Sequence, residues 1–226
     1  MNRKNIIEQA IKGIDLISKL GLDADIIGFK SADKVYDLHA EIPVNTEVIS
    51  LYKSDDEYIH FLRHDAAHVL AQGLTHIFPN IEFGKQFFKD TNVFGFDVFF
   101  PEHKFTKDDF PKIEKAMKDV VAKSDDIIRH VWSKEKALQY FPNDQFKQDI
   151  ISNAPKNTIM LYEHGDYIDI CGGPRGMNNS HVGNHFVLLD VQDSEWMFNS
   201  SKKMQRIICA CFRNESEMKD FLMEYK

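Results

Sequence analysis

The chain has 226 residues, of which 43% are hydrophobic and 12% aromatic, and it can form one large domain or a medium domain with a smaller unit. Its 28 Lys and Arg against 35 Asp and Glu give a net charge of −7, which argues against unspecific coating of nucleic acid but not against a local RNA-binding patch. The chain lacks a membrane-spanning apolar stretch and a signal-peptide core, and its three Cys are too few for a disulfide framework. We therefore expect a cytoplasmic protein without a membrane partner.

Residues 1–53 predict a small unit made of one helix and short strands. Apolar residues recur with a helical period from Asn5 to Leu20, and Gly21 follows as a plausible stop. Short alternating runs predict strands at 24–29, 35–40 and 48–52. The unit would begin at its helix, and about 50 residues are too few for high stability without a neighbour.

The best helix of the chain is predicted from Asp55 to Ile77. Ser54 and Glu57 have the spacing of a capping box at its start. Three histidines fall on one stripe of this helix, at i, i+4 and i+8: His60, His64 and His68. Because residues four apart lie one above the other on a helix, two neighbouring imidazoles can reach a single point.

Strands and shorter helices alternate after this helix, which predicts an α+β fold with an antiparallel sheet packed on it. The predicted strands are 81–88, 92–100, 126–132, 158–162, 167–171, 184–191, 195–198 and 205–212. The predicted helices are 107–123, 134–140, 145–152 and a last one from 214 to the end of the chain. Thr106 with Asp109 caps the first of these, Asn214 caps the last, and residues 163–166 read as a hairpin turn.

A second group of reactive side chains lies about a hundred residues after the histidines. Asp169 and Cys171 alternate along a predicted strand, so both project to one face. The turn that follows, Gly172-Gly173-Pro174, presents backbone amides beside the thiol. His64, His68 and Cys171 could together bind zinc or position a water for hydrolysis. The competing interpretation is a chance pair of histidines and a buried structural cysteine.

Zinc is possible but not favoured at this group. A zinc site has four ligands, or three and a water. The residue four past Cys171 is Arg175, a permanent cation that cannot be a ligand. His181 and His185 are the nearest substitutes. We therefore expect no cofactor and no tightly bound metal.

The order of motifs resembles the N-terminal region of threonyl-tRNA synthetase. The motifs are RHDAAHVLAQ at 63–72, FTKDDFPKIEKAM at 105–117, DYIDICGGP at 166–174 and KKMQRI at 202–207. That family has HSxxHxL in the same helix, CRGPH in the same turn and NxMLQRIYG in the same last strand. The resemblance covers nearly the whole chain, from about Asn5 onward.

The resemblance implies a shortened β-grasp (TGS-like) unit at 1–53, a tRNA-editing domain at 54–213 and the start of a connector helix at 214–226. In that family the editing domain hydrolyses serine wrongly attached to threonine tRNA. A missing methyl group gives only about 1–3 kcal/mol of binding discrimination, so a second, hydrolytic site completes the selection. The expected enzyme is thus an aminoacyl-tRNA ester hydrolase.

Site roles follow from the family position by position. The resemblance assigns catalysis to His64, His68, Cys171, Asp169 and Lys147. It assigns substrate binding to Tyr162, and the related positions Phe96 and Arg175 are expected to face the substrate. Arg175 stands where the family has a histidine, and Phe96 lies in an FGFD run where the family has FYYD.

Two other functions compete with editing. A non-catalytic tRNA-binding module would have lost the chemistry at the altered positions, and a zinc-dependent hydrolase would resemble alanyl editing. The expected partners are threonine tRNA mischarged with serine and, because no aminoacylation core follows, the rest of a synthetase. The connector-like last helix favours a fragment over a free-standing relative.

Overall fold

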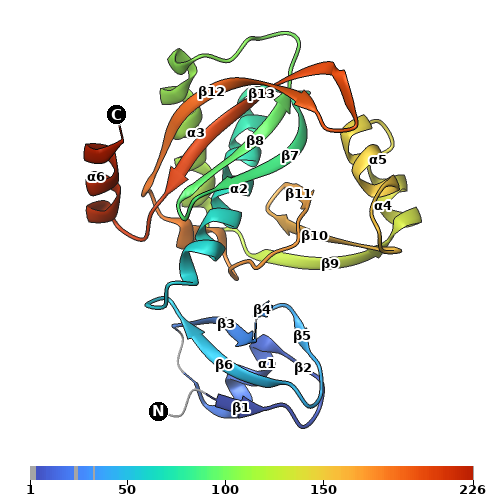
Figure 1. Ribbon diagram of the computed structural model, residues 1–226, viewed down its shortest axis with the longest axis vertical. Coiled ribbons are helices and arrows are strands. Elements are labelled where there is room, and N and C mark those ends of the chain that lie inside the picture. Colours follow the sequence, from blue (N-terminus) through green and yellow to red (C-terminus); the bar gives the residue numbers. More distant parts are fainter. Residues whose placement is uncertain (1–3, 23–24, 33, 226) are drawn as a thin grey trace.

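The computed structural model describes residues 4–22, 25–32 and 34–225. Its helices and antiparallel sheets confirm the predicted α+β class (Figure 1). A small N-terminal unit lies against a larger one, and each has its own cluster of buried apolar side chains. Ala24, where a predicted strand starts, and Lys226, where the last helix was expected to end, lie outside the described residues.

The N-terminal unit does not begin at its helix. Strands β1 (Lys4–Ile6) and β2 (Ile11–Lys12) precede α1 (Gly13–Leu20), so the helix predicted from Asn5 was wrong over its first half. Pairing of β1 with β6 and of β2 with β5 replaces the local helical preference, because tertiary hydrogen bonds outweigh weak intrinsic propensity. The bounds of the other strands are β3 (Ile26–Ser31), β4 (Lys34–Asp37), β5 (Glu41–Ile42) and β6 (Glu47–Tyr52).

Helix α2 (Tyr58–Ile77) is the central helix of the larger unit. It begins three residues later than predicted, and the capping box is not formed. Glu57, the carboxylate expected in the box, instead pairs with Lys30 of β3 at 2.6 Å, and Asp55 accepts the Tyr52 amide. The start of α2 is therefore bound to the N-terminal unit.

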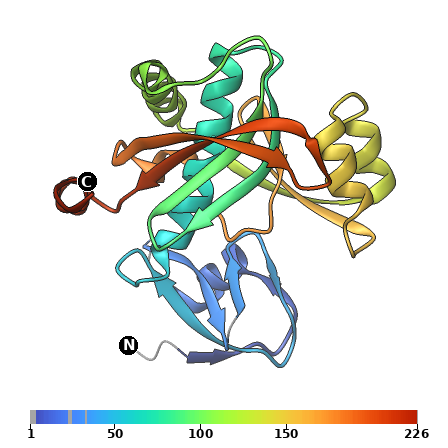
Figure 2. The same cartoon turned by 45° about the horizontal axis from the view of Figure 1, so that its top comes forward.

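The larger sheet has the strand order β12-β13-β8-β7, and α2 and α3 (Phe110–Lys123) pack on the same side of it (Figure 2). Its strands are β7 (Glu82–Lys89), β8 (Val93–Phe99), β12 (Phe186–Trp196) and β13 (Asn199–Cys211). The separate strand predicted at 195–198 was wrong, because β12 continues to Trp196 and turns directly into β13. The Thr106–Asp109 capping box is confirmed at η1 (Lys107–Asp109), which leads into α3.

A second sheet, with order β11-β10-β9, lies beside α2 and brings the cysteine segment to it. The hairpin predicted at 163–166 is confirmed, with His164 paired to Tyr167. The bounds here are β9 (Ile127–Ser133), α4 (Lys134–Tyr140), α5 (Gln145–Ser152), β10 (Thr158–His164), β11 (Tyr167–Ile170) and η2 (Asn179–Val182).

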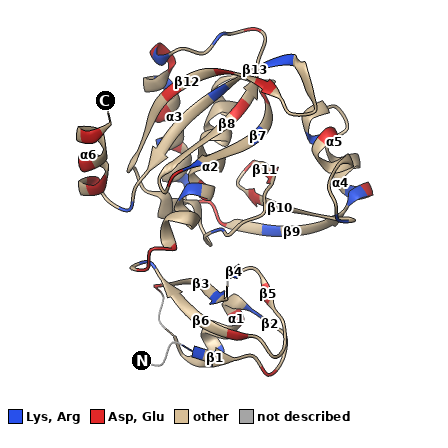
Figure 3. Ribbon diagram, in the orientation of Figure 1, with Lys and Arg blue, Asp and Glu red and all other residues tan. Residues whose placement is uncertain are grey.

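The last helix, α6 (Glu215–Glu224), is capped by Asn214 as predicted. Its acidic residues form a band of negative charge at one side of the molecule (Figure 3). Within the described ranges, every helix is too short or too polar to cross a membrane.

Candidate active site

A cavity of about 430 Å³ collects four of the predicted site residues. Phe96 of β8, Lys147 of α5, Asp169 of β11 and Cys171 line it together. Most of the other lining side chains are apolar. The volume lies in the range of about 300–1,000 Å³ that is usual for small-molecule sites, and a few polar groups in an apolar wall are typical of such sites.

Lys147 and Asp169 form a buried ion pair in this wall. Their Nζ and Oδ1 atoms lie 2.5 Å apart, and the side chains are 5% and 1% exposed. The Tyr167 hydroxyl donates to the other oxygen of Asp169 at 2.8 Å, and the Ile170 amide also donates to this carboxylate. The carboxylate therefore holds the ammonium group in one place within reach of a bound ligand.

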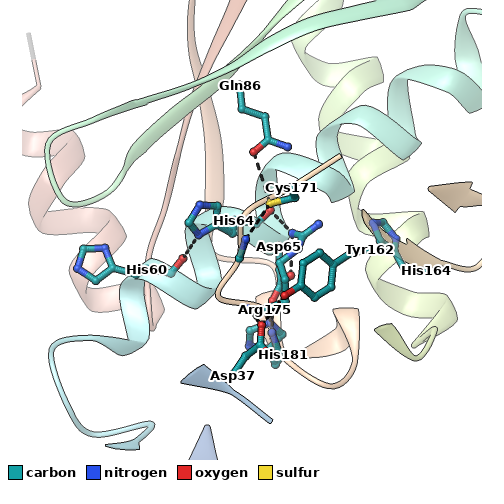
Figure 4. Close-up of polar contacts among 12 residues, drawn as sticks. Asp37, His60, His64, Asp65, Gln86, Tyr162, His164, Cys171, Arg175 and His181 are labelled. Atoms are coloured by element: carbon teal, nitrogen blue, oxygen red, sulfur yellow. Dashed lines mark hydrogen bonds and ion pairs between the residues drawn. The ribbon is translucent and has the colours of Figure 1, made fainter. Parts of the chain in front are cut away.

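The Cys171 thiol is a neutral hydrogen-bonding group here. Burial raises the pKa of the thiol, and this outweighs the opposing effect of the Arg175 cation. The Gly173 amide donates to its sulfur at 3.4 Å, and the thiol lies 3.8 Å from Oε1 of Gln86 (Figure 4). Because the thiolate is the nucleophilic form, this environment favours orientation of substrate or water over covalent attack.

His64 lies on the wall of an adjoining, more open cleft. Gly172 lines both this cleft and the cavity, so the histidine and the thiol lie on either side of a shared backbone wall. Nδ1 of His64 is 3.0 Å from the His60 carbonyl, which can only accept, so Nδ1 carries the proton and Nε2 is the acceptor atom of the ring. Burial, with Arg175 second, lowers the pKa of His64 to about 4. The ring is thus a neutral acceptor at pH 7.

His68 is fully buried behind this wall. Its ring packs against those of His164 and Tyr167, with centroids 5.4 and 5.6 Å away. Neither ring nitrogen has a hydrogen-bond partner among the described residues. Burial, followed by the Arg175 charge, lowers the pKa of His68 well below its usual value. This ring therefore stays neutral, and its direct role in catalysis remains a prediction.

Arg175 is fully buried, and its described contacts are with the protein. Its guanidinium pairs with Asp65 of α2 at 2.8 Å and donates to the His64 carbonyl. His181 and the Gly176 amide bind the other oxygen of Asp65 at 2.6 and 2.7 Å. Burial raises the pKa of Asp65, but Arg175 and His181 outweigh it and bring that pKa to about 2. Arg175 thus anchors its loop to α2.

Tyr162 of β10 is also fully buried. Its hydroxyl donates to Asp37 of the N-terminal unit at 2.6 Å, and the Arg175 guanidinium lies 5.3 Å from the centre of its ring. Substrate contact by Tyr162 and by Arg175 remains a prediction. The Tyr162 hydroxyl and Nη1 of Arg175 are engaged with protein partners, whereas Nε and Nη2 of Arg175 have no hydrogen-bond partner among the described residues.

Sequence reasoning missed three residues of this region: Asp37, Asp65 and Gln86. Asp65 left a signal, since a carboxylate between His64 and the apolar pair Ala66 and Ala67 falls on a helix that is buried nearly all round. Asp37 and Gln86 come from strands far away in the sequence, so only the tertiary structure brings them here.

The possible zinc ligands do not form a recognisable metal cluster. Among residues 4–22, 25–32 and 34–225, no three His, Cys, Asp or Glu side chains are grouped so that they could hold an ion. His181, the substitute ligand considered from the sequence, is hydrogen-bonded to Asp65. That the chain holds no tightly bound zinc stays a prediction.

Comparison with known proteins gives a consistent group of relatives. The threonine–tRNA ligase of Ehrlichia canis (strain Jake) is 36% identical over 222 residues, which are 95% of this chain and 34% of that enzyme. The same enzyme of Wolbachia sp. subsp. Brugia malayi (strain TRS) is 32% identical over 218 residues, 94% of this chain and 34% of its own. That of Sulfurihydrogenibium sp. (strain YO3AOP1) is 33% identical over 232 residues, 98% of this chain and 36% of its own.

No protein-family profile matches the chain. The relatives nevertheless align with almost all of it, and the aligned part is about one third of their length. The chain is therefore related to threonine–tRNA ligases over nearly its whole length and spans about a third of theirs.

Proposed function

We propose that this chain hydrolyses the ester bond of serine wrongly attached to threonine tRNA. The relation to threonine–tRNA ligases supports the substrate class. The observation that carries the reaction is the cavity that joins Lys147, Asp169 and Cys171 and borders on the cleft of His64. Its apolar wall and small volume suit an aminoacyl group, and its polar groups suit an ester.

The polar groups have complementary roles in this reaction. Attack of water on the ester carbonyl puts negative charge on its oxygen, and the Lys147 ammonium, held by Asp169, stabilises that charge. Nε2 of His64 accepts a hydrogen bond from the attacking water and orients it across the Gly172 wall. The neutral Cys171 thiol helps to hold the substrate. The bond between the acyl carbon and the ribose oxygen then breaks, and a proton from the water passes to that oxygen, which leaves serine and free tRNA as the products.

The experiment is a deacylation assay with seryl and threonyl esters of threonine tRNA. We expect the seryl ester to be hydrolysed and the threonyl ester largely spared. Ala substitution of His64, His68, Lys147 or Cys171 should lower the rate by about 10²–10⁴-fold wherever the side chain acts directly. Losses of only two- or threefold would indicate packing alone.

Matched variants separate chemistry from packing. Cys209→Ala removes another buried thiol, in the core of β13, and His60→Ala removes an exposed histidine on the same helix as His64. Both should keep nearly the full rate. If the unaltered chain binds threonine tRNA with a strong salt dependence but deacylates neither ester, the hydrolase proposal is wrong and the tRNA-binding module is the better account.

A further inference from the structure

The contact between the two units is built around one buried carboxylate. Asp37 ends strand β4 of the N-terminal unit and is 3% exposed. It lies next to Tyr162 and Arg175 of the larger unit, although more than 120 residues separate them in sequence (Figure 4). A buried carboxylate is retained at low cost only when donors surround it.

Three donors surround this carboxylate. Oδ2 of Asp37 accepts the Tyr162 hydroxyl at 2.6 Å and the Arg175 amide at 3.2 Å, while Oδ1 accepts the His39 amide at 3.1 Å. His39 makes a second link, because its Nε2 lies 2.9 Å from the Gly176 carbonyl. The N-terminal unit therefore binds the segment from Gly173 to Gly176 at Arg175 and at Gly176.

Gly173 packs closely against the hydrogen bond between Tyr162 and Asp37. A Cβ atom on Gly173 would lie 2.8 Å from the Tyr162 hydroxyl and 3.1 Å from Oδ2 of Asp37, and the backbone there has φ +67°. On the other side, the Gly176 amide is bound by Asp65 of α2. The loop is thus hydrogen-bonded to α2 on one side and to the N-terminal unit on the other.

The backbone of the 173–176 loop connects these hydrogen bonds to the cavity. The Gly173 amide donates to the Cys171 sulfur, so a displacement of Gly173 changes the environment of the thiol. We propose that Asp37 is a positioning residue of the site: by holding Tyr162 and the 173–176 loop, it keeps Cys171 in place in the cavity. The effect of Asp37 on catalysis rests on the proposed hydrolytic function, whereas its positioning of the loop and of Cys171 does not.

The test measures thiol exposure and activity side by side. Native protein is treated with iodoacetamide, and alkylation of each of the three cysteines is followed by mass spectrometry. Asp37→Ala should speed alkylation of Cys171 by about tenfold or more, because hydrogen bonds to a charged group are lost, and leave Cys209 and Cys211 at their original rates. Asp37→Asn keeps one acceptor oxygen and should give a smaller increase. Asp15→Asn, at an exposed position of α1, is the control and should give none.

A double-mutant experiment tests whether Asp37 acts through Tyr162. In a Tyr162→Phe background, Asp37→Ala should add less than it does alone, since one of the shared hydrogen bonds is already gone. In the deacylation assay, Asp37→Ala should lower kcat with little change in KM, and Asp37→Asn should recover part of kcat.

Two results would overturn the proposal. Unchanged alkylation of Cys171 in Asp37→Ala would show that the carboxylate does not hold the loop. An equal rise at all three cysteines would show general loosening in place of local positioning. If the unaltered chain deacylates nothing, the proposed function fails, but the alkylation rates still decide whether Asp37 positions the loop.

Discussion

The buried guanidinium of Arg175 sets the electrostatic conditions of the histidines around it. After burial itself, its charge is the next cause of the lowered pKa values of His64, His68 and His164. A buried cation paired with one carboxylate is costly to disrupt, because removal of either partner leaves an uncompensated charge. Arg175 therefore links the stability of the 173–176 loop to the basicity of His64.

Substitution of Arg175 by histidine, the residue that the sequence resemblance places there, tests that link. We expect Arg175→His to raise the rate of seryl-tRNA deacylation, because loss of the permanent cation lets the pKa of His64 rise toward the working pH. Arg175→Lys keeps the positive charge and should give no gain. Single-turnover deacylation rates of the three proteins provide the comparison, and an unchanged rate for the histidine variant would show that the arginine does not limit the reaction.

The lowered histidine pKa values also predict how stability depends on pH. His64 has a pKa of about 4 in the folded chain and about 6.5 when unfolded, so the unfolded chain binds more protons between these values. The stability from a neutral His64 is complete above pH 6.5 and is lost as the pH falls toward 4. We expect His64→Asn to remove about 2 kcal/mol of the decline in unfolding free energy between pH 7 and pH 5.

Denaturant titrations at the two pH values measure this effect. His185→Asn, outside the cluster, is the matched control for loss of a histidine. If His64→Asn shows that decline in full, folding does not lower the pKa of His64.

At the scale of elements, the β10–β11 hairpin determines where Asp169 and Cys171 lie. Its turn contains Gly165, which has φ +57°, and a Cβ atom there would lie 2.4 Å from Asp125 and 3.0 Å from Gln72. Gln72 in turn bridges His164 and Asp166, with bonds of 2.8 and 2.6 Å. The turn is thus tied to α2 by a polar chain that only glycine accommodates.

A pair of glycine variants separates backbone strain from this close packing. Gly21, after α1, has φ +60°, but nothing lies within 4 Å of a Cβ atom built there. Gly21→Ala should cost about 1 kcal/mol, the usual penalty for a side chain in this conformation. Gly165→Ala should cost about 1–3 kcal/mol more, because of the clash and the broken chain of hydrogen bonds. Equal unfolding midpoints for the two variants would contradict the role of the turn.

On the scale of the whole molecule, the loop after β11 lies where the two units meet (Figure 2). One side of it is bound by Asp65 of the larger unit and the other by Asp37 and His39 of the smaller. The division into units at residue 53, predicted from the sequence, stays a prediction. The hydrogen bonds imply that the smaller unit contributes to the shape of the site and is more than an appendage.

The metal content of the purified chain distinguishes metal-free from zinc-dependent hydrolysis. The permanent charge of Arg175 stands where a fourth ligand would be needed. We expect protein purified without added zinc to hold far less than one zinc per chain, and we expect deacylation to resist a chelator. Near one zinc per chain, with activity lost on chelation and restored by zinc, would favour the zinc-dependent alternative.

The sequence by itself determined most of the local structure and the relationship. The period of apolar residues and the caps at Thr106 and Asn214 depend on neighbours a few residues away, so the helices that follow residue 100 were correctly predicted. The motif order was sufficient to indicate threonyl-tRNA synthetase, because it depends only on residue identity.

The tertiary structure decided what depends on distant partners. Pairing with β6 and β5 made strands of residues 4–6 and 11–12, and Glu57 binds Lys30 in place of its expected cap. It also turned Arg175 inward to Asp65 and tied Tyr162 to Asp37. These contacts join residues more than 20 positions apart, and their strength comes from burial that no local pattern encodes, which is why the sequence did not predict them.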